Sequence, residues 1–387
     1  MPISFIEYDV KPLLSHVGIH RSHISQAPFL LQDAVTDPDE ANRFMRMFYL
    51  FQGTQQEKFS LELQAKALSI RHFYKINLSN EAEHVRVLAI VAPGDMLQNL
   101  PVDYLLEKQG VELNLLYLMP HEDLPTQFPE HDVTIFALGQ SSANKHILSQ
   151  LRQLILKWPK PFINHPKYIE YCARDQVYKL LKDIQGLKVA KQVLFKRNEI
   201  VWNDFPCTIR PLDSHAGESF ERISDVQSLD KYLENQSSDQ FYVGEYLDCK
   251  NEDGYYRKFR VALIGGEPYV AHLAISKNWV VSYISAEMYL NEDKRNEESN
   301  FMQNFDVVIA DKFKHQFREI CKKIPLEYMV LDCSISKGGE LIVFEIDNSA
   351  WVHNTDSEVL FPYKKNHMRL LMNKFLKLIF TKYESQN

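Results

Sequence analysis

The sequence predicts a mixed fold, in which an α/β unit and then an α+β domain follow a helical N-terminal region. Apolar strand-like runs alternate with helical segments between residues 81 and 160, which is the pattern of a parallel α/β unit. Two later segments read strand, Gly-Gly, strand, and Gly-Gly supplies the positive φ angles of tight hairpin turns. A chain of 387 residues suits two or three domains. We therefore expect domains over residues 1–80, 81–160 and 161–387.

The first region is expected to be helical after an irregular start. Asp37 followed by Pro38 is a good helix opening, with Asp as N-cap and Pro at the first helical position. An apolar stripe at helical spacing follows, made of Phe44, Met47, Phe48 and Phe51. We interpret this stripe as a packing face. A second helix is expected over about residues 57–72. Because no acid–base or phosphate-loop pattern occurs before residue 80, we expect no catalytic ligand from this region.

The second region is expected to form a small parallel sheet with covering helices. Its three strand-like runs are Val85–Ala92, Val111–Met119 and His131–Leu138. Helices are expected over about residues 100–109 and 144–157. The loop after the first run reads APGDM and lacks the G-x-G-x-x-G pattern, so the sequence argues against a dinucleotide site there.

Composition and charge exclude several classes of protein. The net charge is −7 and the pI about 6.1, whereas nucleic acids and anionic membranes select basic surfaces. The five cysteines are odd in number and form no C-x-x-C pair, so neither a disulfide framework nor a zinc ribbon is indicated. The start of the chain lacks the pattern of a secretory signal. No apolar run approaches the ~20 residues that span a bilayer. We expect a cytoplasmic protein without nucleic-acid or membrane partners.

The second Gly-Gly hairpin carries the strongest chemical signal. If Gly338 and Gly339 are its two loop residues, Asp332 lies directly opposite Glu345, and Asp347 shares a face with Glu345. Like charges opposite one another destabilise a sheet, so a cation must offset them. Carboxylate oxygens at this spacing suit Mg²⁺. An exposed acidic edge, or carboxylates paired with Lys and Arg, would give the same pattern.

This hairpin resembles the metal-binding hairpin of the ATP-grasp superfamily. That family ends one strand with Asp and closes the next with E-x-N, where this chain reads LDC and then FEIDN. The resemblance implies Asp332, Glu345 and Asp347 as ligands of Mg²⁺ (or Mn²⁺) bound with ATP. The third ligand is usually Asn, so Asp347 adds a negative charge and leaves one or two metal ions open. Residues 81–385 resemble uncharacterised bacterial members, which implies an ATP-grasp fold preceded by a small Rossmann-like pre-ATP-grasp domain.

Further segments resemble the nucleotide-binding parts of that superfamily. Arg210-Pro211 stands where the family commonly has Lys-Pro before a flap over the phosphates, and Arg174 resembles a second phosphate-binding cation. FYVGEYLDCKNED resembles the hinge that binds adenine through its main chain, with Glu252 as a candidate for the ribose. The flap and hinge residues implied are Ser214, His215, Ala216, Gly217, Glu245, Tyr246 and Leu247.

The strand before the first Gly-Gly turn carries the cations Arg257, Lys258 and Arg260. Lys258 and Arg260 share one face of the strand. In the family, an Arg in such an R-V-x-x-x-G-G strand helps to hold the transferred phosphate, which implies Arg260 and Arg210 as catalytic residues and Lys258 as an ATP contact. A solvated basic face is the alternative interpretation. The substrate-pocket candidates implied are Arg257, His272, Lys277, Arg295 and His353.

The resemblance implies an ATP-dependent carboxylate–amine ligase that acts through an acyl phosphate. Its partners would be small-molecule or peptide carboxylates and amines, and a homodimer is left open. Two alternatives stay open. The same site could phosphorylate a hydroxyl or a carboxylate as a kinase, or the chain could be a non-catalytic nucleotide-binding module.

Overall fold

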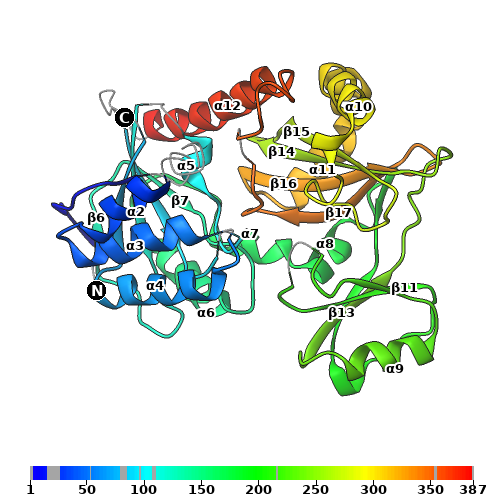
Figure 1. The fold of residues 1–387 in the computed structure, drawn as a ribbon, viewed down its shortest axis with the longest axis horizontal. Coiled ribbons are helices and arrows are strands. Elements are labelled where there is room, and N and C mark those ends of the chain that lie inside the picture. The colour runs from blue at the N-terminus through cyan, green and yellow to red at the C-terminus, as the bar shows by residue number, and fades with distance from the viewer. Residues whose placement is uncertain are drawn as a thin grey trace.

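The computed structural model describes residues 3–14, 27–52, 54–78, 85–95, 97–106, 110–214, 217–352 and 355–385. It contains a six-stranded, a five-stranded and a four-stranded sheet, together with one short pair, β1 (Ser4–Ile6) and β6 (Gln127–Pro129). The six-stranded sheet and its helices lie at one side of the molecule, and the other two large sheets lie at the opposite side (Figure 1). This is the mixed α/β and α+β class that the sequence predicts. No helix within the described ranges is long and apolar enough to cross a membrane.

The six-stranded sheet has the order β2-β3-β5-β4-β7-β8. Neighbouring strands run parallel, except that β3 and β5 are antiparallel. The central strand β4 (Val85–Val91) is buried at every position but Arg86, as expected of a strand covered on both faces. The other strands are β2 (Leu13–Leu14), β3 (Phe73–Asn77), β5 (Val111–Tyr117), β7 (Val133–Phe136) and β8 (Phe162–Ile163).

Helices cover both faces of this sheet. Val87 and Ala89 pack in one core with side chains of α3 (Glu40–Phe51) and α4 (Glu57–Ile70). Leu88 and Ile90, on the opposite face, pack in another core with side chains of α6 (Lys145–Leu154). The remaining helices of this part are α2 (Ala27–Val35), α5 (Val102–Leu105) and α7 (Pro166–Ile169).

Helix α3 begins two residues later than the Asp37-Pro38 opening indicates. Its N-cap is Asp39, whose carboxylate accepts a hydrogen bond from Asn42 N at 3.0 Å. Asp37 is buried instead and accepts a hydrogen bond from Arg46 Nη1 at 2.9 Å. Phe48 is buried in the core beneath α3, and the other three members of the apolar stripe pack partly buried against it. The stripe is therefore the packing face that the sequence predicts.

Residues before position 80 belong to the same sheet as the α/β unit that follows them. Strand β2 pairs with β3, and β3 pairs with β5. Strand β8 extends the sheet beyond residue 160. The division into domains over residues 1–80, 81–160 and 161–387 stays a proposal, and in it the first two parts share one sheet.

The two remaining large sheets face one another across the candidate site. The four-stranded sheet is antiparallel, and helix α9 (Val226–Glu234) packs on it. Its strands are, in spatial order, β10 (Gln192–Lys196), β13 (Gln240–Glu245), β11 (Cys207–Pro211) and β12 (Glu221–Ile223). The five-stranded sheet consists of β15 (Glu267–Ser276), β14 (Tyr256–Ile264), β16 (Tyr328–Ile335), β17 (Leu341–Asp347) and β9 (Leu187–Val189). Its neighbouring helices are α8 (Arg174–Leu181), α10 (Glu292–Gln303), α11 (Lys314–Lys323) and α12 (Lys364–Glu384).

The two Gly-Gly hairpins differ in their turns. In the first, Ile264 pairs with Glu267, so Gly265 and Gly266 form a two-residue turn with φ angles of 59° and 87°. The second hairpin pairs Ile335 with Leu341, which leaves a five-residue loop over residues 336–340. The predicted two-residue turn at Gly338-Gly339 is therefore wrong.

The predicted opposition of carboxylates is nevertheless present, because Asp332 pairs with Glu345. The longer loop shifts the register by one residue, and an irregularity between Asp332 and Cys333 shifts it back. The two register shifts cancel at this pair. The carboxylates therefore lie opposite one another as predicted, but not because of the two-residue turn on which the prediction was based.

Candidate active site

A cavity of about 350 Å³ lies between the four-stranded and five-stranded sheets. No described residue before Leu97 lines it. Thirteen of the residues selected from the sequence do line it, although they are spread over more than 170 positions of the chain. They are Arg174, Arg210, Gly217, Glu245, Tyr246, Leu247, Arg257, Lys258, Arg260, His272, Asp332, Glu345 and Asp347.

Other selected residues lie elsewhere. Ser214 lines a smaller neighbouring cavity of about 40 Å³, which shares Arg174, Glu345 and Asp347 with the main one. Glu252 is exposed on a turn, Lys277 is exposed over the Tyr255 ring, and Arg295 donates to the carbonyls of Met288 and Tyr289. These three do not line the cavity. His215, Ala216 and His353 lie outside the described residues.

Asp332 is the centre of a compact charge cluster on the floor of the cavity. It is 6% exposed and accepts hydrogen bonds from Lys258 Nζ at 2.9 Å and Arg260 Nε at 2.7 Å. Burial raises the pKa of Asp332, but Arg260 and Lys258 outweigh burial and hold it far below the usual range. Arg260 also donates to the carbonyl of Trp351 at 2.8 Å. Asp332 is therefore ionised, and its charge is already matched by two cations.

Replacing Asp332 with asparagine is expected to lower the free energy of unfolding by about 3–5 kcal/mol, because it leaves two partly buried cations without a counter-charge. Urea unfolding at neutral pH measures the loss. Since the pKa of Asp332 is lower in the folded than in the unfolded chain, this stabilisation is present above about pH 4, the unfolded pKa, and is lost in stronger acid. Asp253→Asn, at an exposed carboxylate paired with Arg257, is the control and should change stability little. Equal stability of both variants and the parent would contradict a structural role of the cluster.

Glu345 and Asp347 lie together on one face of β17 and line both cavities. Arg174, the first residue of α8, donates to Glu345 Oε1 at 2.6 Å, and its charge helps to lower the pKa of Glu345 against the effect of burial. Among the described residues none forms a comparable ion pair with Asp347, although the charge of Arg260 acts to lower its pKa. Burial and the charge of Glu345 raise its pKa, although Ser349 N and Oγ donate to its Oδ1 at 2.7 and 2.8 Å.

The sequence predicts that the three carboxylates converge on one metal site. All three line the cavity, but Asp332 is already paired with Lys258 and Arg260. Within the described ranges, no group of three His, Cys, Asp or Glu side chains is arranged to hold a metal ion. The pair Glu345 and Asp347 does offer hard oxygen donors, and its mutual repulsion is the kind that a cation relieves.

Arg210 projects from β11 on the opposite wall of the cavity. It is 6% exposed, and burial together with the nearby charge of Arg174 lowers its pKa to about 10. Its guanidinium donates to Ser214 Oγ at 2.9 Å and to the Ser214 carbonyl, and it lies over the ring of Phe220. Among the described residues, no carboxylate lies within ion-pair distance of it. A buried cation held only by neutral groups is well suited to bind an anion.

Phe220, which follows Arg210 in the chain, contacts the loop after β15 across the cavity. The rings of Phe220 and Trp279 lie 5.0 Å apart, and Trp279 lies 5.6 Å from the ring of Tyr246 in the expected hinge. Gly217 has a φ of 84°, and a Cβ there would lie 3.1 Å from Val280 Cγ1. Glycine is therefore favoured at this position both by the backbone conformation and by the close approach of Val280.

Two aromatic residues of the cavity were not predicted from the sequence. In the stretch HLAISKNWVVSY the prediction names His272, which lines the cavity, and Lys277, which does not. Trp279 and Tyr283 also line the cavity. The ring of Tyr283 lies 4.6 Å from that of His272, and its hydroxyl donates to Glu298 and accepts from Lys364. Strand β15 ends at Ser276, so strand alternation could not indicate which later side chains turn inward.

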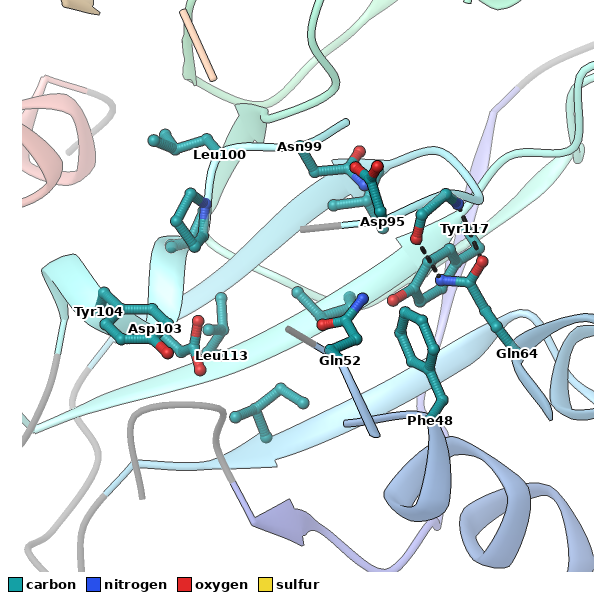
Figure 2. A pocket seen from close by; sticks show the side chains of 16 residues that line it. Phe48, Gln52, Gln64, Asp95, Asn99, Leu100, Asp103, Tyr104, Leu113 and Tyr117 are labelled. Atoms are coloured by element: carbon teal, nitrogen blue, oxygen red, sulfur yellow. Dashed lines mark hydrogen bonds between the residues drawn. The ribbon is translucent and has the colours of Figure 1, made fainter. Parts of the chain in front are cut away.

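A separate cavity of about 50 Å³ lies in the α/β part of the chain, between helix α3 and the end of β4 (Figure 2). Gln64 closes one side of it by pairing with the backbone of Gly94, to which it donates at 3.0 Å and from which it accepts at 2.8 Å. Such a volume accommodates a few water molecules. It is too small for a nucleotide, so the cavity between the two other sheets is the candidate active site.

No protein-family model and no curated protein matches the sequence. Its fold is similar to those of solved structures whose sequences are 10–13% identical to this chain. These include a D-alanine–D-alanine ligase from Bacillus anthracis complexed with ATP (TM-score 0.46, 13% identity, 78% of this chain and 98% of that chain). The VanG D-Ala:D-Ser ligase from Enterococcus faecalis gives a TM-score of 0.48 at 12% identity, over 76% of this chain and all of that chain. A RimK domain protein, described as ATP-grasp, from Sphaerobacter thermophilus gives 0.45 at 10% identity, over 76% of this chain and 99% of that chain.

The hairpin of Asp332 and Glu345 faces the strand of Arg210 across one cavity, and Tyr246 also lines that cavity. The similarity to these structures concerns the fold, which is of the mixed α/β class that the sequence predicts.

Proposed function

We propose that this chain is an ATP-dependent ligase that joins a carboxylate to an amine through an acyl phosphate. The observation that carries the proposal is the pair of facing walls in the 350 Å³ cavity. One wall presents the buried cation Arg210, and the other presents Glu345 and Asp347 beside the cluster of Asp332, Lys258 and Arg260.

ATP would bind with its adenine at the hinge of Glu245, Tyr246 and Leu247 and its phosphates between Arg210 and Lys258. Burial, and after it the charge of Arg174, lowers the pKa of Arg210, and polyphosphate oxygens between the two cations would relieve their repulsion. Ser214 and Gly217 belong to the flap that covers this end of the cavity.

Glu345 and Asp347 are the residues that would hold Mg²⁺ (or Mn²⁺) with the nucleotide. Bound there, the metal would neutralise phosphate charge as the phosphoryl group is transferred. Asp332 would act next to this site by holding Lys258 and Arg260 in place, since its own charge is matched by both.

The reaction proceeds in two balanced steps. A carboxylate oxygen of the substrate attacks the γ-phosphorus of ATP, the bond to the β-phosphate oxygen breaks, and ADP leaves. The neutral amine then attacks the acyl carbon, phosphate leaves with the bonding electrons, and the amine nitrogen loses a proton to give the amide. Arg260, on the strand facing this region, stabilises the charge on the transferred phosphoryl group. Phe220 and Trp279 close the cavity and exclude water, which would otherwise hydrolyse the acyl phosphate.

Hydroxylamine trapping tests this chemistry. With Mg-ATP and a panel of amino acids, peptides and other carboxylic acids, the protein should release ADP and phosphate only when its carboxylate is present. Hydroxylamine should intercept the acyl phosphate as a hydroxamate, measured by its ferric complex or by mass spectrometry. A stable phosphoester without hydroxamate would indicate a kinase that acts on a hydroxyl. Nucleotide binding without release of ADP across the panel would indicate a binding module.

A further inference from the structure

The α/β part of the chain contacts the segment that follows β17 at a point where no side chain fits. Gly139 follows β7, and a Cβ at this position would overlap with Ser349 Oγ and lie 3.1 Å from Ser349 Cβ and 3.0 Å from the Gln98 carbonyl oxygen. The φ of Gly139 is not in the left-handed region, so its backbone conformation does not require glycine. The requirement comes from the close approach of Ser349.

The backbone on the Gly139 side of this contact is held from several directions. Gly139 N donates to the Gln98 carbonyl at 2.8 Å, and Asn144 Nδ2 donates to the Gly139 carbonyl at 2.9 Å. One residue earlier, the Leu138 carbonyl accepts a hydrogen bond from Asn348 Nδ2 at 2.9 Å. Asn144 and Asn348 are both buried. A side chain at position 139 would therefore displace Ser349 rather than move the Gly139 backbone.

Ser349 is in turn the residue that orients Asp347. Its N and Oγ donate to the same oxygen, Asp347 Oδ1, at 2.7 and 2.8 Å. This leaves Oδ2 of Asp347 without a bond to Ser349. Both residues line the main cavity. The chain of contacts therefore runs from the end of β7, through Gly139 and Ser349, to one oxygen of a carboxylate in the candidate active site.

We propose that Gly139 and Ser349 are positioning residues, through which the α/β part of the chain sets the orientation of Asp347 toward the metal–nucleotide complex. The inference rests on the proposed function, because it takes Asp347 as a ligand of that complex. Neither residue takes part in the chemistry under this proposal. The α/β part would then affect catalysis through the contact between Gly139 and Ser349. Only glycine at position 139 leaves room for Ser349 to lie this close.

The test compares Gly139→Ala, Ser349→Ala and the double variant with the parent protein. Binding of Mn²⁺ in the presence of a non-hydrolysable ATP analogue is followed by electron paramagnetic resonance, and thermal unfolding monitors the fold. Gly139→Ala should raise the Mn²⁺ concentration at half-saturation by about 10-fold or more, the range seen when groups that orient metal ligands are removed. Gly338→Ala, in a loop where a Cβ would lie 3.5 Å from its nearest neighbour, is the matched control and should bind Mn²⁺ as the parent does.

The double variant shows whether the two residues act through one another. Without the Ser349 hydroxyl, a methyl group at position 139 loses the atom with which it overlaps most, so the double variant should bind Mn²⁺ about as well as Ser349→Ala alone. Additive losses, or parent-like Mn²⁺ binding by Gly139→Ala, would overturn the inference while leaving the proposed function intact. If Gly139→Ala fails to fold, parent-like binding by Ser349→Ala overturns it in the same way. A parent protein that binds no Mn²⁺ with the nucleotide overturns the proposed function and this inference together.

Discussion

Replacing Asp347 with alanine is expected to reduce ATP turnover by about 100-fold or more without lowering thermal stability. The loss of activity follows from removing one of the two carboxylates that would hold the metal ion. Stability should be unchanged or higher because burial and the charge of Glu345 raise the pKa of Asp347. A carboxylate with a raised pKa binds its proton more tightly in the folded chain, so at neutral pH its charge disfavours folding. Steady-state release of ADP and thermal unfolding at pH 7 measure the two effects.

Asp347→Asn is the informative comparison, because it removes the charge but keeps one oxygen donor. It should retain more activity than Asp347→Ala. Its thermal stability, like that of Asp347→Ala, should equal or exceed that of the parent. Asp332→Asn should behave in the opposite way, with a clear loss of stability, since Asp332 neutralises two cations. Normal turnover by Asp347→Ala would refute the assignment of the metal site to Glu345 and Asp347.

Replacing Arg260 with alanine is expected to lower kcat by about 100-fold or more and to change ATP affinity much less. Arg260 lies on β14 opposite Asp332, and its guanidinium is fixed by that carboxylate and by the carbonyl of Trp351. A rigid cation in this place stabilises charge that develops on the phosphoryl group as it is transferred. A contact formed mainly in the transition state affects turnover rather than binding. Single-turnover kinetics and nucleotide titration separate the two quantities.

Arg257→Ala is the comparison for this effect. Arg257 is on the same strand and carries the same charge, but it pairs with Asp253 and Glu297 rather than with Asp332. Its replacement should lower kcat much less than that of Arg260. Because loss of Arg260 also weakens the cluster around Asp332, Arg260→Lys serves as a milder variant that keeps the charge without the fork of donors. Equal effects of Arg257→Ala and Arg260→Ala on kcat would argue against a specific role for Arg260.

The hairpin of Asp332 and Glu345 shows how far local pattern can predict a site. The position of the glycines led to the correct prediction that the two carboxylates lie opposite one another, although the turn assumed for it was wrong. That position is not enough to predict the five-residue loop at residues 336–340 or the compensating irregularity next to Asp332. Register depends on the turn and on every bulge along the strands, and a bulge is decided by packing against neighbouring strands rather than by the residues of the hairpin alone.

The charged residues of the site also show what the sequence can predict and what it cannot. The sequence identifies Lys258, Arg260 and the carboxylates as chemically important, because charged residues on otherwise apolar strands require partners. It does not say which cation meets which anion. Strand β14 lies between β15 and β16, and this order brings Lys258 and Arg260 to Asp332, while α8 brings Arg174 to Glu345 from 171 positions away. Pairing across such separations follows from sheet order and helix placement.

Hydrophobic period and short-range geometry, which a local stretch of residues contains, are enough to predict the class of the fold, the packing stripe of α3 and the strands of the parallel sheet. The opposition of Asp332 and Glu345 was predicted correctly from a turn that proved wrong. The packed structure shows in addition that two cations neutralise Asp332, whereas burial and the charge of Glu345 raise the pKa of Asp347. It also brings Trp279 and Tyr283 to the cavity and Gly139 against Ser349. Those features depend on segments far apart in the chain that meet only after the sheets have packed, so no local pattern carries them.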